Sequence, residues 1–374
     1  MHPMVQNLVS ALGRVAREAV LYPQIRGPGR RVMFFPSSGR EQSGLLRVYN
    51  ISDHLNASGW RSVVVPKHLG LGQRNRLLRV FQPDVVVMQK CRHRLNRIEH
   101  FQGQRVVLDI DDADFFDPAL TSVMEAAAGG ASGVICGSRF IRDWARLFNR
   151  NTEVVWTGTP ISDGPWPAHA DRRKIVTWAQ SSPLTYPKEF AFVTRLLVSA
   201  RAQVGPFALR LYGWNAPHDH PDLAPFRNAE IELELCGTLP YDDFVMSLRE
   251  VAVGLSPVMV QSEFSRGKSF GKVLAYLDAK VPVICSDEAD HSEFFDAATG
   301  IVSNDFSVWK DGLQMLLTDH TRRQAMADGA HAEFCQRLSI RVAAERVDAF
   351  LRKSTAPTST VSPTPPLSSG VRGP

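Results

Sequence analysis

Short apolar runs recur along the first half of the chain, and polar segments with helical periodicity separate them. Runs rich in Val, Ile and Phe, bounded by Gly, Pro or Asp, are typical of buried strands. The predicted strands are residues 31–36, 61–66, 84–88, 105–110, 133–136 and 153–156. Helices are predicted at residues 44–57, 74–81 and 121–128, and from Arg139 onward with Ser138 as N-cap. This alternation predicts a parallel sheet.

A second alternation follows a stretch rich in Pro and Gly at 158–167, which has the composition of an interdomain linker. Its predicted strands are residues 174–178, 207–212, 231–236, 253–256 and 281–285. Helices near 308–317, 321–338 and 339–352 come last. The predicted fold class is therefore α/β, with two successive doubly wound, Rossmann-like halves.

These patterns predict five segments. They are an N-terminal helical extension (1–30), two Rossmann-like domains (31–160 and 161–335), a C-terminal helix (336–353) and a tail (354–374). The tail is Ser, Thr and Pro with few apolar residues, so we expect it to be disordered. In the extension, the apolar residues with helical spacing are Val5, Leu8, Leu12, Val15 and Ala19. They favour a helix packed on the first domain over one lying on an anionic membrane surface.

Composition narrows the classes of function. The 374 residues, 44% of them hydrophobic, suit two domains with sizeable cores. The net charge of +5 suits a phosphate-bearing substrate or an anionic membrane face, and the absence of a basic run with interleaved aromatics argues against a nucleic-acid partner. The five scattered cysteines form no C-x-x-C pair, which argues against a disulfide framework or a zinc site.

The expected location of the protein in the cell follows from its apolar runs and its N-terminal charges. No apolar run is long enough for a membrane helix, and Arg14, Arg17 and Glu18 interrupt any secretory signal. We therefore expect a cytoplasmic protein, with peripheral contact to the inner membrane face left open.

A basic, glycine-containing loop opens a predicted helix at residues 266–272. Backbone N–H groups at a helix start bind phosphate, and Arg266 and Lys268 add positive charge. Lys272 follows Lys268 by one helical turn, so both can point to the same side. A pyrophosphate site is favoured over a solvated basic loop.

The stretch that begins with this loop resembles the donor-site motif of family 4 glycosyltransferases, G-K-S-x-x-K-x-x-E-Y-M-A-A-G-V-P-V. The matching residues are Gly267, Lys268, Ser269, Lys272, Tyr276, Ala279, Val281, Pro282 and Val283. The segment from Gly237 to Pro257, and Ser181 and Thr185 after Trp178, are also similar to that family, and the resemblance covers most of 31–350.

The resemblance implies a GT-B fold, two facing Rossmann-like domains with a cleft between them, and a hexosyltransferase-like enzyme. Its donor would be a nucleotide sugar, and its acceptor a glycan or a lipid-linked precursor of a surface polysaccharide. It implies retention at the sugar, domain closure, no metal and no cofactor. The implied phosphate ligands are Ser181, Thr185, Arg266, Gly267, Lys268, Ser269 and Lys272. Tyr276 and the Gly237 region would lie near the nucleoside.

One position departs from the family. Its ribose-binding Glu corresponds here to Ala275, which cannot accept hydrogen bonds from hydroxyls. Another acid (Glu263, Asp287 or Glu293) could substitute, donor choice could be relaxed, or the protein could bind nucleotide without catalysis. A membrane-associated scaffold that uses the extension and the tail is a further alternative.

Acidic residues follow a predicted strand of the first half: Asp109, Asp111, Asp112 and Asp114. Ligands of open α/β sheets bind at the carboxyl ends of strands, where a carboxylate can accept the proton of an acceptor hydroxyl. We expect Asp111 and Asp112 to be catalytic, ahead of Asp109. The alternative is that these acids only cap a turn. Asp109 and Asp111 also imitate a metal-binding D-x-D, a reading that the GT-B resemblance disfavours.

The first predicted strand leads into a loop at residues 37–44, with Arg47 just beyond it. Gly39 and Gly44 permit close approach of a ligand to the backbone. The loop resembles the family's glycine-bearing loop near the phosphates and acceptor, and Arg47 could pair with phosphate. A plain surface loop is the alternative.

Overall fold

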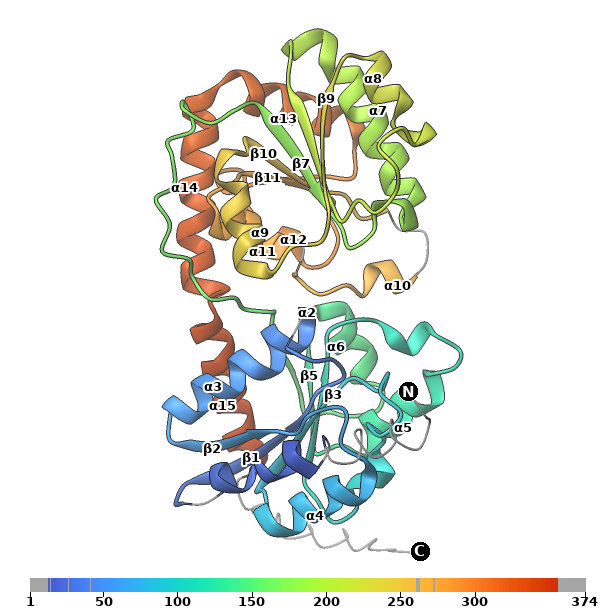
Figure 1. Cartoon of the computed structure of the whole chain (residues 1–374), viewed down its shortest axis with the longest axis vertical. Coiled ribbons are helices and arrows are strands. Elements are labelled where there is room, and N and C mark those ends of the chain that lie inside the picture. The colour runs from blue at the N-terminus through green and yellow to red at the C-terminus, as the bar shows by residue number, and fades with distance from the viewer. Residues whose placement is uncertain are drawn as a thin grey trace, which may run out of the picture.

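The computed structural model describes residue 13 and residues 15–25, 27–40, 42–259, 263–271 and 273–355. Two six-stranded parallel sheets form the centres of two halves of the chain (Figure 1). The strand order is β2-β1-β3-β4-β5-β6 in the first sheet and β12-β11-β10-β7-β8-β9 in the second. The predicted architecture of two Rossmann-like sheets is confirmed, whereas the exact domain boundaries stay predictions.

The first half follows the predicted alternation closely. Its strands are β1 (Arg30–Phe35), β2 (Trp60–Val64), β3 (Val85–Gln89), β4 (Val106–Ile110), β5 (Gly133–Cys136) and β6 (Thr152–Val154). Its helices are η1 (Tyr22–Ile25), α2 (Gln42–Gly44), η2 (Leu45–Tyr49), α3 (Asn50–Ala57), α4 (Leu71–Phe81), η3 (Ile98–Phe101), η4 (Asp114–Phe116), α5 (Thr121–Gly130) and α6 (Arg139–Ala145). Every residue of β3 and β4 is buried, as expected for parallel strands with helices on both faces.

The second half repeats the plan. Its strands are β7 (Ile175–Ala179), β8 (Ala208–Tyr212), β9 (Glu232–Cys236), β10 (Val253–Ser256), β11 (Val283–Cys285) and β12 (Ile301–Val302). Its helices are η5 (Pro183–Thr185), α7 (Pro187–Val204), η6 (Pro221–Leu223), α8 (Ala224–Asn228), α9 (Tyr241–Ser247), η7 (Leu248–Glu250), α10 (Glu263–Arg266), α11 (Leu274–Asp278), α12 (His291–Phe294), α13 (Phe306–Thr318) and α14 (His320–Arg337). The sequence did not predict β12, because two residues are too few to show a strand pattern.

The chain passes between the halves twice, and the two crossing segments lie side by side. Thr159 and Ser339 form an isolated parallel bridge, and the Ile340 N–H donates to the Thr159 carbonyl at 2.7 Å. The last helix, α15 (Ile340–Thr355), then packs on the first sheet together with α3. Figure 1 shows α14 along the upper half and α15 beside α3 in the lower half. The chain thus returns to its first domain.

The described end of the N-terminal extension is packed on the first half. The buried Glu18 accepts hydrogen bonds from Arg76 at 2.6 Å and from Gln73 at 2.9 Å, both on α4. The Arg76 hydrogen bond is the main reason that the pKa of Glu18 falls to about 2. Residues 15–19 therefore lie against the first half through Glu18, whereas Val15 and Ala19, which the sequence placed on the packing face, are exposed. Val5, Leu8, Leu12 and residues 356–374 lie outside the described residues, while 354–355 belong to α15 rather than to a disordered tail.

Within the described ranges, no helix combines the length and the apolar character that crossing a bilayer requires.

Candidate active site at the junction of the two halves

Loops at the carboxyl ends of strands from both sheets meet between the halves. A Cβ at Gly267, after β10, would overlap the Cβ of Ala113, which follows β4. A Cβ at Gly137, after β5, would lie 2.9 Å from both Asp111 Cα and Ser269 Cβ. The two glycines let the backbones approach this closely. We call this region, formed by 109–114 and 137–140 of the first half and 181–189 and 265–271 of the second, the junction.

Contacts at one side of the junction hold the two halves together. Asp290, before α12, accepts from the Arg139 backbone N–H at 2.9 Å and from Trp156 Nε1 at 2.8 Å. Arg139 also forms an ion pair with Glu293. The Trp156 ring stacks on Phe270 with centroids 5.5 Å apart. Glu293, one of the acids considered as a substitute for the missing ribose ligand, is therefore engaged with Arg139 across the junction.

Lys268 lies inside the junction, half-buried. Its ammonium is 4.5 Å from the centroid of the Tyr186 ring, a cation–π distance. Burial lowers the pKa of Lys268, while Glu189 and Asp112 oppose that shift. A half-buried cation in a partly dry setting attracts an anion more strongly than a solvated one does, so Lys268 is suited to bind a polyanion.

Of the other predicted donor residues, Arg266 and Ser269 belong to the same segment after β10 as Lys268. The Arg266 guanidinium lies 5.2 Å from the centroid of Phe140, on α6 of the first half. Ser269 is half-buried against Gly137. The loops after β7 and β9 supply three exposed residues: Ser181, Thr185 and Gly237. Lys272 lies outside the described residues.

The structure contradicts the prediction for Tyr276. Its side chain is 1% exposed, its hydroxyl accepts from the Ala179 backbone N–H at 2.9 Å, and its ring faces Gly254. Tyr276 therefore fixes the end of β7 from within the core and does not face a nucleoside. The neighbouring Ala275 is also buried, at 4% exposure.

The carboxylates after β4 are paired with two cations that follow β3. The Lys90 ammonium lies 2.8 Å from Asp111 Oδ1 and 2.7 Å from Asp112 Oδ2. Arg92 donates to Asp112 Oδ2 at 3.1 Å and to Asp114 Oδ2 at 2.8 Å. Burial would raise the pKa of Asp111, but Lys90 and other nearby cations hold it below its ordinary value. Asp111 is buried and Asp112 half-exposed, so Asp112 is the more accessible of the two predicted catalytic residues.

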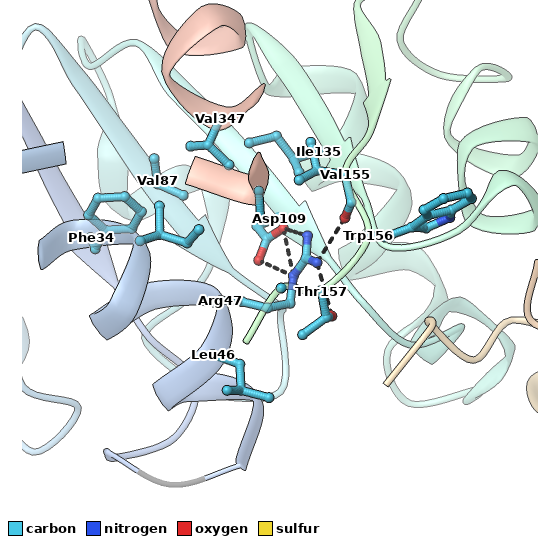
Figure 2. A pocket seen from close by; sticks show the side chains of 13 residues that line it. Phe34, Leu46, Arg47, Val87, Asp109, Ile135, Val155, Trp156, Thr157 and Val347 are labelled. Atoms are coloured by element: carbon cyan, nitrogen blue, oxygen red, sulfur yellow. Dashed lines mark hydrogen bonds and ion pairs between the residues drawn. The ribbon is translucent and has the colours of Figure 1, made fainter. Parts of the chain in front are cut away.

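Arg47 and Asp109 form a separate buried ion pair, shown in Figure 2. Arg47 Nε lies 3.0 Å from Asp109 Oδ2, and Nη1 donates to the Val155 carbonyl at 2.9 Å and to Thr157 at 3.3 Å. A rare π-helical turn, η2, carries Arg47 into this position. The prediction that Arg47 pairs with phosphate is wrong, because its donors are used inside the first half.

The loop after β1 is tied to the end of β3. The Gln89 side chain accepts from the Ser37 backbone N–H at 3.1 Å and donates to the Ser43 carbonyl at 3.2 Å. A Cβ at Gly44 would overlap the Gly39 carbonyl oxygen. The close approach that Gly44 permits is therefore to its own loop, and a role for either glycine beside a ligand stays a prediction.

The D-x-D pattern does not form a shared site, since Asp109 faces Arg47 while Asp111 faces Lys90. Among the described residues, no three His, Cys, Asp or Glu side chains are grouped so that they could hold a metal ion.

Sequence reasoning missed several residues in or beside the junction: Gln89, Lys90, Arg92 and Glu189. Gln89 and Lys90 come at the carboxyl end of β3, so the rule that selected the acids after β4 would also have selected them. Glu189 is buried at the start of α7 and accepts from the Met259 backbone N–H at 3.1 Å. An acid in the first turn of a helix is common, so that residue carried no distinct signal.

Comparison with solved structures places the fold among glycosyltransferases. A glycosyltransferase from Rickettsia africae ESF-5 has a TM-score of 0.68 at 9% identity, over 88% of this chain and 100% of that one. Sucrose-phosphate synthase from Thermosynechococcus elongatus has a TM-score of 0.62 at 13% identity, over 87% and 98%. HepE from Anabaena, solved in complex with UDP and glucose, has a TM-score of 0.60 at 13% identity, over 87% and 100%.

No protein-family model and no curated protein matches the sequence. The chain has the GT-B fold, which is the class that the two facing Rossmann-like halves define.

Proposed function

We propose that this protein is a glycosyltransferase that moves a sugar from a nucleotide-sugar donor to a hydroxyl of a glycan or lipid-linked acceptor. The observation that carries the proposal is the half-buried Lys268, held at the junction opposite the acidic segment of the other half. The GT-B fold adds support, and the relative solved with UDP and glucose favours UDP as the nucleotide.

In the proposed reaction the second half stabilises the leaving diphosphate, and the first half accepts the proton of the acceptor hydroxyl. The bond between the anomeric carbon and the donor's diphosphate oxygen breaks, and its electron pair leaves with the diphosphate. Lys268 and Arg266 stabilise that charge, which is the largest electrostatic demand of the reaction. The acceptor oxygen bonds to the anomeric carbon, and its proton passes to Asp112. Retention at the sugar and independence of metal are part of the proposal, on the basis of the sequence resemblance.

A screen of UDP-, GDP- and dTDP-sugars tests the proposed function. We expect one of these donors to raise the thermal unfolding midpoint and to be hydrolysed or transferred, since a donor stabilises the state that it binds. Calorimetry with free UDP reports binding separately from turnover. If no nucleotide binds and no donor is consumed, the proposal is refuted.

A second candidate is a relative that binds a nucleotide sugar without transferring it. Ala275 favours this alternative, because the family's ribose-binding Glu is replaced by a side chain without an acceptor. Nucleotide binding by calorimetry, together with zero turnover across sugar donors and hydroxyl acceptors, would select it.

The close approach of Gly267 to Ala113 predicts that a larger residue at position 267 lowers activity by keeping the two halves apart. In the Gly267→Ala variant, the new Cβ overlaps Ala113, so the halves must separate or the loop must shift. Overpacking of this kind costs about 1–3 kcal/mol, so we expect kcat to fall by about 10-fold or more. Steady-state kinetics with the donor found in the screen measure the effect.

Gly271→Ala is the matched control, because a Cβ at Gly271 meets its nearest atom, Ser269 Oγ, at 3.8 Å. Equal loss of activity in the two variants would show that the contact with Ala113 is not the cause.

A further inference from the structure

Lys90 occupies an unusual position for a lysine. It follows β3, is 3% exposed, and its ammonium lies between two carboxylates, Asp111 and Asp112, at 2.8 and 2.7 Å. Neither the motif resemblance nor the proposed chemistry assigns it a role. Burying a lysine is costly unless the ammonium is fully paired, and here carboxylates on the predicted catalytic segment supply the pairing.

The backbone at Lys90 is strained. Its φ is +50°, in the left-handed region that is unfavourable for a residue with a Cβ. A fully buried amide, Asn96, holds the turn by donating to the Gln89 carbonyl at 2.9 Å and to the Phe35 carbonyl at 3.1 Å. Arg74, also buried, donates to Asn96 Oδ1 at 3.0 Å. Strain that the surrounding structure enforces in this way is frequent at functional sites.

Lys90 and Arg92 both donate hydrogen bonds to the same oxygen of Asp112. The acceptor is Oδ2, at 2.7 Å from Lys90 and 3.1 Å from Arg92. Neither cation donates a hydrogen bond to Oδ1. The Asp112 side chain is 27% exposed, and its charge acts on Lys268 and on Tyr186 of the other half. Asp112 is therefore held at one oxygen, in a segment whose next residue, Ala113, lies directly against Gly267 of the donor loop.

We propose that Lys90 is a positioning residue for the transfer reaction. Its ammonium, fixed by the strained turn, holds Asp112 Oδ2 so that Oδ1 accepts the hydrogen bond of the acceptor hydroxyl. Asp111 anchors the ammonium from the buried side. This inference rests on the proposed function, because it assigns the orientation of a group that the proposed chemistry uses.

The test compares Lys90→Met with wild type, using the UDP-sugar that the screen identifies. Met preserves the length of the side chain and removes the charge. We expect kcat to fall by about 100-fold or more, in the range of a lost general base, while the donor KM changes by less than about 3-fold. UDP affinity, measured by calorimetry, should stay within about 3-fold of wild type because the nucleotide binds the other half.

Chemical rescue separates positioning from a structural role. In Lys90→Ala, added ethylammonium can occupy the vacated space beside the two carboxylates, and we expect it to restore at least about 10-fold of the lost kcat without changing thermal stability. Should the neutral variants fail to fold, Lys90→Arg keeps the charge but presents a planar, longer donor. We expect a lower kcat at unchanged KM in that variant too.

Lys280→Met is the matched control. Lys280 is also a lysine with positive φ, +52°, and it pairs with Asp328 at 3.1 Å on the second half. We expect wild-type kcat from it. Suppose that Lys90→Met, or Lys90→Arg where only that variant folds, keeps wild-type kcat while the nucleotide binds and its sugar donor is consumed. The positioning role is then refuted and the proposed function stands. If wild type binds none of the screened nucleotides and consumes none of the UDP-, GDP- and dTDP-sugars, both fall.

Discussion

Replacing Lys268 by alanine is expected to lower transfer and donor hydrolysis by about 10²–10³-fold. The ammonium lies at the junction against the Tyr186 ring, and its half-buried setting lowers its pKa. A fixed charge in a partly dry site needs little reorganisation when the diphosphate departs, which is why removal of one such group is costly. The kcat/KM of the donor found in the screen measures the loss, and calorimetry with UDP measures how much of it is ground-state binding.

Lys174→Ala provides the control for the removal of one positive charge. Lys174 is exposed and precedes β7, so it lies at the amino edge of the second sheet, opposite to the junction. We expect this variant to behave as wild type. Wild-type turnover in Lys268→Ala would instead remove the basis for the proposed donor site.

The sequence predicted the elements that make the two sheets and the segments that meet between them. Parallel strands buried on both faces give continuous apolar runs, such as residues 84–88 and 105–110, which are easy to recognise. The carboxyl-end rule then selected the loops around Asp111 and Lys268, which the structure brings to the same junction.

The sequence could not predict where individual side chains point. Tyr276 matches a family motif, yet a helix presents several faces, and the hydrogen bond to Ala179 turns this residue inward. Arg47 lies one turn after a glycine loop, and the π-helical turn redirects it toward Asp109. Both outcomes depend on partners far away in the chain, which periodicity does not report.

The second large effect that we expect concerns stability. Arg47→Met leaves the Asp109 carboxylate buried without its cation, in a setting where burial already raises the pKa of Asp109 and Arg47 partly offsets that shift. Breaking a buried ion pair from one side costs about 3–5 kcal/mol. Urea unfolding should show this loss as a lower midpoint for the first half. Arg346→Met is the control: its ion pair with Glu153, at 2.6 Å, is exposed, so its loss should cost less than about 1 kcal/mol.

The double variant Arg47→Met with Asp109→Leu shows whether the cost comes from the unpaired charge. Apolar side chains lie around the pair, among them Phe34, Val87 and Val347 (Figure 2). Replacing a whole buried pair by hydrophobic residues of similar volume is often neutral or stabilising. We therefore expect the double variant to regain most of the lost stability. A double variant as unstable as Arg47→Met would mean that the hydrogen bonds of Arg47 to Val155 and Thr157, rather than its charge, hold the segment that leads to the second half.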